Sequence, residues 1–158
     1  MDNIDPAILN GVSIPFVESV KNLGVMIDQS LTGELWVKQV CWKAFAPINR
    51  FYRCGGNYQS VSVRRTLVNA LILPIIDYGM IPNTALTALN KRKLQRVQNS
   101  CIRFVHGMGR SEALSTVYID ANCLRIPNRQ SWLVLMFFYK AVVKDAGPDY
   151  IKQSNSRE

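Results

Sequence analysis

The sequence has little from which a metal or catalytic centre could be built. His106 is its only histidine, and none of the four cysteines, Cys41, Cys54, Cys101 and Cys123, forms a Cys-x-x-Cys pair. Structural zinc sites usually draw their ligands from such closely spaced pairs, so we expect no zinc site. No Asp-Asp pair occurs anywhere in the chain. Cys41 and Cys101 fall on apolar helix faces, where a cysteine acts as a small core residue.

Long apolar runs are also missing. The stretch "LVNALILPII" is interrupted by Asn69 and Pro74, and "WLVLMFFYKAVV" contains Lys140. Both are too short to cross a bilayer. The first ten residues are acidic rather than basic and then apolar, which is unlike a signal peptide. We therefore expect an intracellular protein that is not secreted, has no membrane partner and needs no disulfide framework.

The basic charge is placed unevenly along the 158 residues, a length typical of one domain. The first 40 residues hold two basic and five acidic residues, whereas the remainder holds 17 basic and six acidic ones. The net charge of +8 therefore arises from a part that carries +11. Such a basic body indicates a polyanionic partner, nucleic acid before membrane. The alternative is a solvated surface that happens to be basic.

Hydrophobic periodicity predicts a short β segment followed by helices. Alternating apolar residues predict strands over Val12–Val17 and Asn22–Asp28, with Pro15 marking an edge strand. Pro47 is expected to kink the first helix, and Pro74 to end or bend the second. The fold class is mainly α: an N-terminal β-hairpin followed by a bundle of about four to five helices. The helices are expected at about 34–53, from about 60 or 62 to Pro74, at 87–106, within 111–123, and at 128–144. The expected domains are a hairpin at 1–30, a helical domain at 31–151 and a disordered tail at 152–158.

The helix expected at 87–106 has the clearest two-sided pattern. Leu94, Val97 and Cys101 belong to its apolar stripe, and Gly107 is well suited to end it. Three arginines fall within a 40° sector on the opposite side when residues are spaced by 100°, namely Arg92, Arg96 and Arg103. This basic face is either a phosphate-binding surface or simply solvated.

Several strings, in this order, resemble reverse transcriptases of non-LTR (LINE-type, jockey-like) retrotransposons. They are "NGVSIPFVESVKNLGVMID", "KQVCWKAFAPINRFYR", "RRTLVNALILPIIDYG", "KRKLQRVQNSCIRFV" and "RIPNRQSWLVLMFFYKAV" followed by "GPDYI". The joint order of "KNLGV-x-x-D", "L-x-x-P-x-x-D-Y-G" and "KLQ-x-x-QN-x-x-x-R" carries most of the specificity. The resemblance covers roughly Ile8 to Ile151 and is to the region just after the polymerase palm.

The resemblance implies a primer grip followed by a thumb and connection region. Leu23, Gly24 and Val25 would then form the primer-grip turn and strand, against a template–primer or RNA–DNA duplex. Basic thumb helices would contact its phosphates, because neutralised phosphates release counterions. The residues expected to bind nucleic acid are Leu23, Gly24, Val25, Lys91, Arg92, Lys93, Arg96 and Arg103.

The same resemblance implies that the catalytic residues for polymerisation are not in this sequence. Reverse transcriptases bind Mg²⁺ with clustered palm carboxylates, which include an aromatic-Ala-Asp-Asp turn, and this sequence shows none. Asp77 stands alone, and His106 has the position of a helix-terminal residue rather than a base. We therefore expect no catalytic residue and no cofactor here: a thumb fragment inactive by itself, whose apolar surface packs on a missing palm or on a second copy. The alternative is a stand-alone basic helical module that binds nucleic acid or protein.

Overall fold

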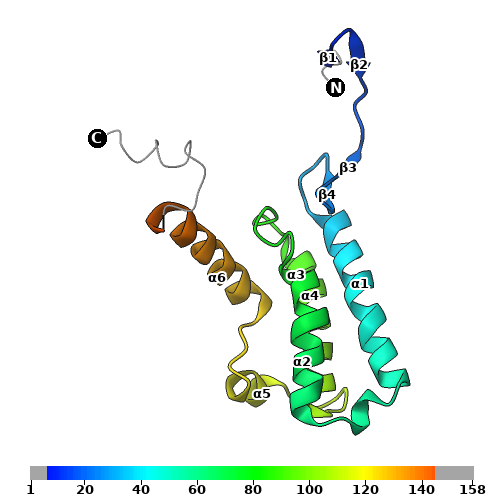
Figure 1. Ribbon diagram of the computed structural model, residues 1–158, viewed down its shortest axis with the longest axis vertical. Helices are drawn as coiled ribbons and strands as arrows, with labels where there is room; N and C mark the ends of the chain where they lie inside the picture. The colour runs from blue at the N-terminus through cyan, green and yellow to red at the C-terminus, as the bar shows by residue number, and fades with distance from the viewer. Residues whose placement is uncertain (1–6, 145–158) are drawn as a thin grey trace.

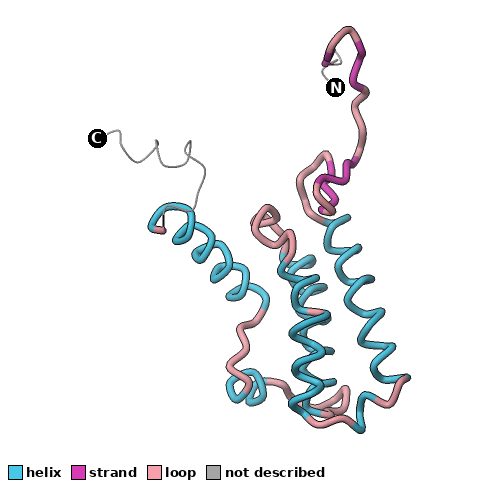
Figure 2. The backbone as a smooth tube through the Cα atoms, viewed as in Figure 1, coloured by secondary structure: helices cyan, strands magenta, loops and turns pink. Residues whose placement is uncertain are grey.

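The computed structural model describes residues 7–144, and this part of the chain is mainly helical after two short β-hairpins (Figures 1 and 2). The hairpins come first, then three long helical stretches side by side, then a helix that leans away from them. The expected fold class is therefore confirmed. The tail expected at 152–158 and the closing string "GPDYI" lie outside the described residues.

The expected pairing of Val12–Val17 with Asn22–Asp28 is wrong, because each strand pairs with a nearer neighbour. β1 (Ala7–Leu9) pairs with β2 (Val12–Ile14), and β3 (Ser19–Asn22) pairs with β4 (Val25–Asp28), both antiparallel. The two turns are Asn10-Gly11 and Leu23-Gly24, and all four residues have positive φ. Two-residue hairpin turns need this backbone conformation because it matches the twist of the strands.

Three helical stretches form the bundle. α1 (Glu34–Arg53) has the expected bounds and continues through Pro47. α2 (Val61–Leu71) is followed by α3 (Leu73–Asp77), whose first turn contains Pro74, so this proline does end the preceding helix. α4 (Ala88–His106) begins after Thr87, whose side chain accepts the Asn90 N–H, and ends at Gly107 in the left-handed conformation.

Contacts at the two ends of the bundle fix the directions of its helices. Lys93 pairs with Glu34 near the start of α1, while the Phe104 ring stacks on Phe51 near its end, so α1 and α4 run parallel. Arg64 near the start of α2 donates to the carbonyl of Phe104 near the end of α4, so α2 runs antiparallel to both.

The core fills the space between these helices and uses the apolar stripes that the sequence pattern indicates. Burying each large side chain contributes roughly 1.5–3 kcal/mol. Cys101 is buried as expected, and burial raises the pKa of its thiol to about 12. The largest fully buried apolar side chains are Trp36, Phe104, Ile48, Ile72, Ile76, Met80, Leu94 and Ile126.

A short 3₁₀ turn (Gly56–Tyr58) joins α1 to α2, and two further helices follow the bundle. α5 (Ser115–Asp120) lies within the region where a short helix was expected. α6 (Ile126–Phe138) begins two residues earlier than the sequence indicates and continues as a π-helical turn, η2 (Tyr139–Val143). Figure 1 shows that α6 leans away from the bundle and that β1 and β2 stand apart at the opposite side.

Candidate nucleic-acid interface

The proposed primer-grip residues occupy the tip and return strand of the β3–β4 hairpin. Leu23 and Gly24 form the turn, with φ of 45° and 85°, and the Leu23 side chain is 84% exposed. A Cβ at residue 24 would meet nothing closer than a Tyr78 ring carbon at 3.6 Å. Glycine is therefore required here by the backbone angle and not by close approach of another group. Val25 instead turns inward and packs on the core.

The string "DYG" joins this hairpin to the helices. The Tyr78 hydroxyl donates to the carbonyl of Leu23, and Gly79 lies against Val25 and Trp36. A Cβ at residue 79 would stand 2.6 Å from Trp36 Nε1, and the residue has φ of 82°, so only glycine fits. The hairpin is thus attached to the bundle through its turn and through β4.

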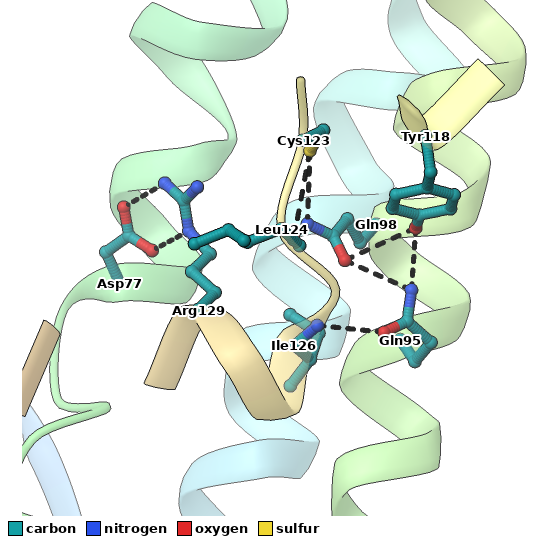
Figure 3. Close-up of polar contacts among 8 residues, drawn as sticks. All are labelled: Asp77, Gln95, Gln98, Tyr118, Cys123, Leu124, Ile126 and Arg129. Atoms are coloured by element: carbon teal, nitrogen blue, oxygen red, sulfur yellow. Dashed lines mark hydrogen bonds and ion pairs between the residues drawn. The ribbon is translucent and has the colours of Figure 1, made fainter. Parts of the chain in front are cut away.

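Asp77, the first residue of that string, holds α6. Its carboxylate accepts two hydrogen bonds of 2.6 Å, from Nε and Nη2 of Arg129 (Figure 3). Bidentate pairs of this kind are the stronger charge-assisted hydrogen bonds, and here the pair raises the pKa of Arg129. Asp77 is the last residue of α3, and its carboxylate is occupied by a structural partner. No group of three or more metal-ligating side chains gathers within residues 7–144.

The five expected phosphate contacts on α4, hereafter the α4 cationic face, do not share one environment. Arg92 and Arg96 are exposed. Lys93 turns toward α1 and pairs with Glu34 at 3.1 Å. Arg103 donates to the carbonyls of Gly109 and Glu112, at 3.1 and 3.3 Å, and so also orders the loop after α4. Lys91 is half-buried at the edge that faces α6.

Two grooves flank this face, and each contains a cation that the sequence reasoning missed. The α1–α4 groove, of about 630 Å³, is lined by Lys38 together with Lys93 and Arg96. The α4–α6 groove, of about 370 Å³, is lined by Arg125 together with Lys91 and Arg92. Helical spacing within α1 could have pointed to Lys38, whereas Arg125 precedes α6 and reaches α4 only through the fold.

Amides in the string "KLQRVQN" hold the segment between α5 and α6 on α4 (Figure 3). Gln95 Nε2 donates to the Tyr118 hydroxyl at 2.6 Å, and Gln95 Oε1 accepts the N–H of Ile126 at 2.9 Å. Gln98, which is buried, donates to the carbonyl of Leu124 at 2.8 Å. Burial raises the pKa of Tyr118, as expected for a hydroxyl used as a hydrogen-bonding group. Gln95 and Gln98 therefore have structural roles, and Gln95 also lines the α4–α6 groove.

The end of α4 carries a second basic cluster. Arg64 is buried, and its Nη1 donates at 2.8 Å to the carbonyl of Phe104 in the last helical turn, where a cation is favourable. His106 is the last residue of α4, as expected. Desolvation, followed by the charges of Arg65 and Arg64, lowers the pKa of His106. This lowered pKa favours the neutral form of the histidine.

Comparisons with family models, with curated proteins and with solved structures find no match for this chain. Among residues 7–144, no helix is both long and apolar enough to span a membrane. The fold and the two grooves define a mainly α, basic domain with a β-hairpin fixed to one end of its bundle.

Proposed function

We propose that this chain is a thumb-type nucleic-acid-binding domain of an RNA-directed DNA polymerase from a non-LTR retrotransposon, and that it holds the template–primer duplex. The observation that carries the proposal is the α4 cationic face. Within residues 7–144, Lys93 is the only cation on that face with a carboxylate partner. From Arg92 to Arg103 the helix rises about 16 Å, which matches roughly five base-pair steps of a duplex.

The position of the β3–β4 hairpin supports one nucleic-acid-binding surface that is formed by the hairpin together with the α4 cationic face. Glu34 begins α1 directly after the β3–β4 hairpin, and it pairs with Lys93. The hairpin and the N-terminal half of the α4 cationic face therefore lie at the same end of the bundle. In this proposal the exposed turn, Leu23 and Gly24, approaches the primer strand, and Val25 fixes this turn to the core. Lys91, Arg92, Lys93 and Arg96 contact phosphates.

The test is salt-dependent binding to a labelled RNA–DNA duplex, measured by fluorescence anisotropy. Each lost phosphate contact should reduce the slope of log K against log salt by about 1. Replacing Arg92, Arg96 and Arg103 by Ala should reduce it by about 2, because Arg103 is partly used by the loop carbonyls. A matched variant replaces Arg50, Arg53 and Lys140, which are exposed and lie off α4. Equal slopes for the two triple variants would overturn the proposal.

Polymerisation is not assigned to this chain. Two-metal phosphoryl transfer needs clustered carboxylates, and Asp77 is committed to Arg129. The chain by itself should show no primer extension with Mg²⁺ or Mn²⁺. Incorporation that persists after substitution of Asp28 and Asp77 would contradict this expectation.

A second candidate, an intracellular protein-interaction module, is favoured by exposed apolar side chains. They cluster on the β1–β2 arm, which includes Ile8, Leu9 and Val12, and on the outer side of α6, which includes Leu135 and Phe138. Large exposed apolar surfaces mark interaction sites. The occupant would be a palm domain or a second copy. Light scattering after size-exclusion chromatography tests the second of these, and a monomer that is stable to dilution would exclude it.

A further inference from the structure

One tryptophan in the middle of α1 is exposed without an evident structural reason. Trp42 is 74% exposed, whereas Trp36, six positions earlier on the same helix, is 1% exposed and belongs to the core. The ring of Trp36 packs in the core and helps to fix α1 there, whereas Trp42 is not among the residues that pack on the core. A large aromatic ring left in water on a rigid helix is available for a ligand.

Helical spacing places Trp42 next to the α1–α4 groove, although its ring is not part of the groove lining. Lys38 lies four positions before it and Phe45 three positions after it, so all three side chains are neighbours on the surface of α1. Both Lys38 and Phe45 line the groove, and α4 contributes Lys93 and Arg96 on the opposite side. The groove therefore contains one aromatic ring and cations from both helices, and Trp42 adds a second, exposed ring beside it on α1.

The floor and the charges of the groove indicate its ligand. Cys41 and Phe45 are half-buried and form an apolar floor, while Lys38 and Arg96 are exposed. Glu34 is the only acid of the lining, and Lys93 neutralises it at 3.1 Å. A volume of about 630 Å³ is within the range of small-ligand sites. The groove suits a flat, apolar group attached to an anion.

Unpaired nucleotides have this chemistry. Proteins that bind single strands combine a basic groove with aromatic rings on which bases stack, whereas a duplex keeps the faces of its bases covered. We propose that the α1–α4 groove binds an unpaired segment of a nucleic-acid strand, with a base stacked on Trp42 and phosphates on Lys38 and Arg96. The inference rests on the proposed function and adds that the strand is single where it crosses this groove.

The experiment compares a labelled 12-nucleotide single strand with an RNA–DNA duplex of the same sequence. Stacking on one aromatic side chain corresponds to about 5- to 150-fold in affinity. Trp42→Leu should weaken single-strand binding by at least about fivefold, leave duplex binding unchanged, and leave the salt slope unchanged because no charge is lost. Lys38→Ala should reduce the single-strand salt slope by about 0.7.

Matched variants make the test specific. Trp132→Leu removes another exposed tryptophan, 47% exposed on α6, and should bind the single strand like the parent. Trp42→Phe keeps an aromatic face and should restore most of the affinity. Binding should quench tryptophan fluorescence in the parent and in Trp132→Leu, but not in Trp42→Leu. Urea midpoints equal to that of the parent show that the variants are folded.

The outcomes separate the two proposals. If the parent binds the duplex with a steep salt slope but Trp42→Leu and Trp132→Leu bind the single strand equally well, this inference is wrong and the proposed function stands. If Trp42→Leu instead changes the oligomeric state without affecting single-strand affinity, the groove is a protein contact and the inference is again wrong. If the parent binds neither nucleic acid, both proposals fail.

Discussion

Gly79 offers a sharp test of how the β3–β4 hairpin is attached to the helices. Gly79→Ala adds one methyl group where the backbone has φ of 82° and where Trp36 Nε1 and Val25 Cγ2 would stand 2.6 and 3.0 Å away. The left-handed conformation costs a residue with a Cβ about 1–2 kcal/mol. Overpacking against a buried ring adds about 1–3 kcal/mol. The free energy of unfolding should therefore fall by about 2–5 kcal/mol.

Gly24→Ala is the matched control, because it separates backbone strain from crowding. Its φ of 85° is nearly the same, but the new Cβ would meet only a Tyr78 ring carbon at 3.6 Å, an ordinary contact. This variant should lose about 1–2 kcal/mol from the backbone alone. The difference between the two variants, about 1–3 kcal/mol, is then the cost of crowding Trp36 and Val25.

Urea unfolding followed by tryptophan fluorescence measures both changes. With a slope of about 2 kcal/mol per molar, the midpoint of Gly79→Ala should fall by about 1 M or more. The cost of Gly79→Ala should also be smaller in a Trp36→Phe background, because the atom at 2.6 Å is then absent. Equal costs for Gly24→Ala and Gly79→Ala would refute the reasoning, since they would mean that β4 and α1 do not press on Gly79.

Two further predictions concern charged groups. Asp77→Ala should lower the free energy of unfolding by about 1.5–3 kcal/mol, because it leaves the Arg129 guanidinium partly buried without its partner; a double-mutant cycle with Arg129→Ala that gives no coupling energy would show that the pair is not formed. His106 should titrate below 6.5 in an NMR pH series, because desolvation and nearby arginines lower its pKa. Its contribution to stability should be present above pH 6.5 and lost as the pH falls through the lowered pKa, and a His106→Gln variant should lack this loss. A measured pKa at or above 6.5 would contradict this prediction.

The helices could be predicted because each has its own local signals. α1 and α4 have an apolar stripe over about five turns, and Thr87 and Gly107 bound α4 at positions that capping chemistry indicates. Pro74 marks a break that depends only on a missing N–H and a clash with the preceding turn. None of these features requires knowledge of distant residues.

The sequence pattern predicts the wrong strand pairing because the Leu23-Gly24 turn contains an unusual residue. Leu23, Val25 and Ile27 alternate with Gly24, Met26 and Asp28, a period of two that is typical of a single strand. Leu23 nevertheless adopts the left-handed conformation at the turn, where Asn, Asp or Gly is usual. The Asn10-Gly11 turn has the preferred sequence and could have been recognised. The alternation of Val12, Ile14 and Phe16 instead predicts one strand that crosses Pro15.

The residues of the candidate interface can be predicted only in part from the sequence, for a different reason. Arg92 and Arg96 follow from helical spacing alone. The separate uses of Lys93 and Arg103, and the addition of Lys38 and Arg125 to the two grooves, depend on packing between elements far apart in the sequence. The same is true of Asp77 and its partner Arg129, which are 52 positions apart.

The three residues Asp77, Tyr78 and Gly79 have a consequence for cooperativity. They contact, in order, α6, the turn of the β3–β4 hairpin, and α1. α6 and the hairpin lie on opposite sides of the molecule (Figure 1). An opening of this one tripeptide removes a contact from each of the three elements at once, so substitutions at Asp77 or Gly79 should lower the opening free energies of amide protons in both α6 and the hairpin. Two parts of the chain that lie apart are in this way coupled through three consecutive residues.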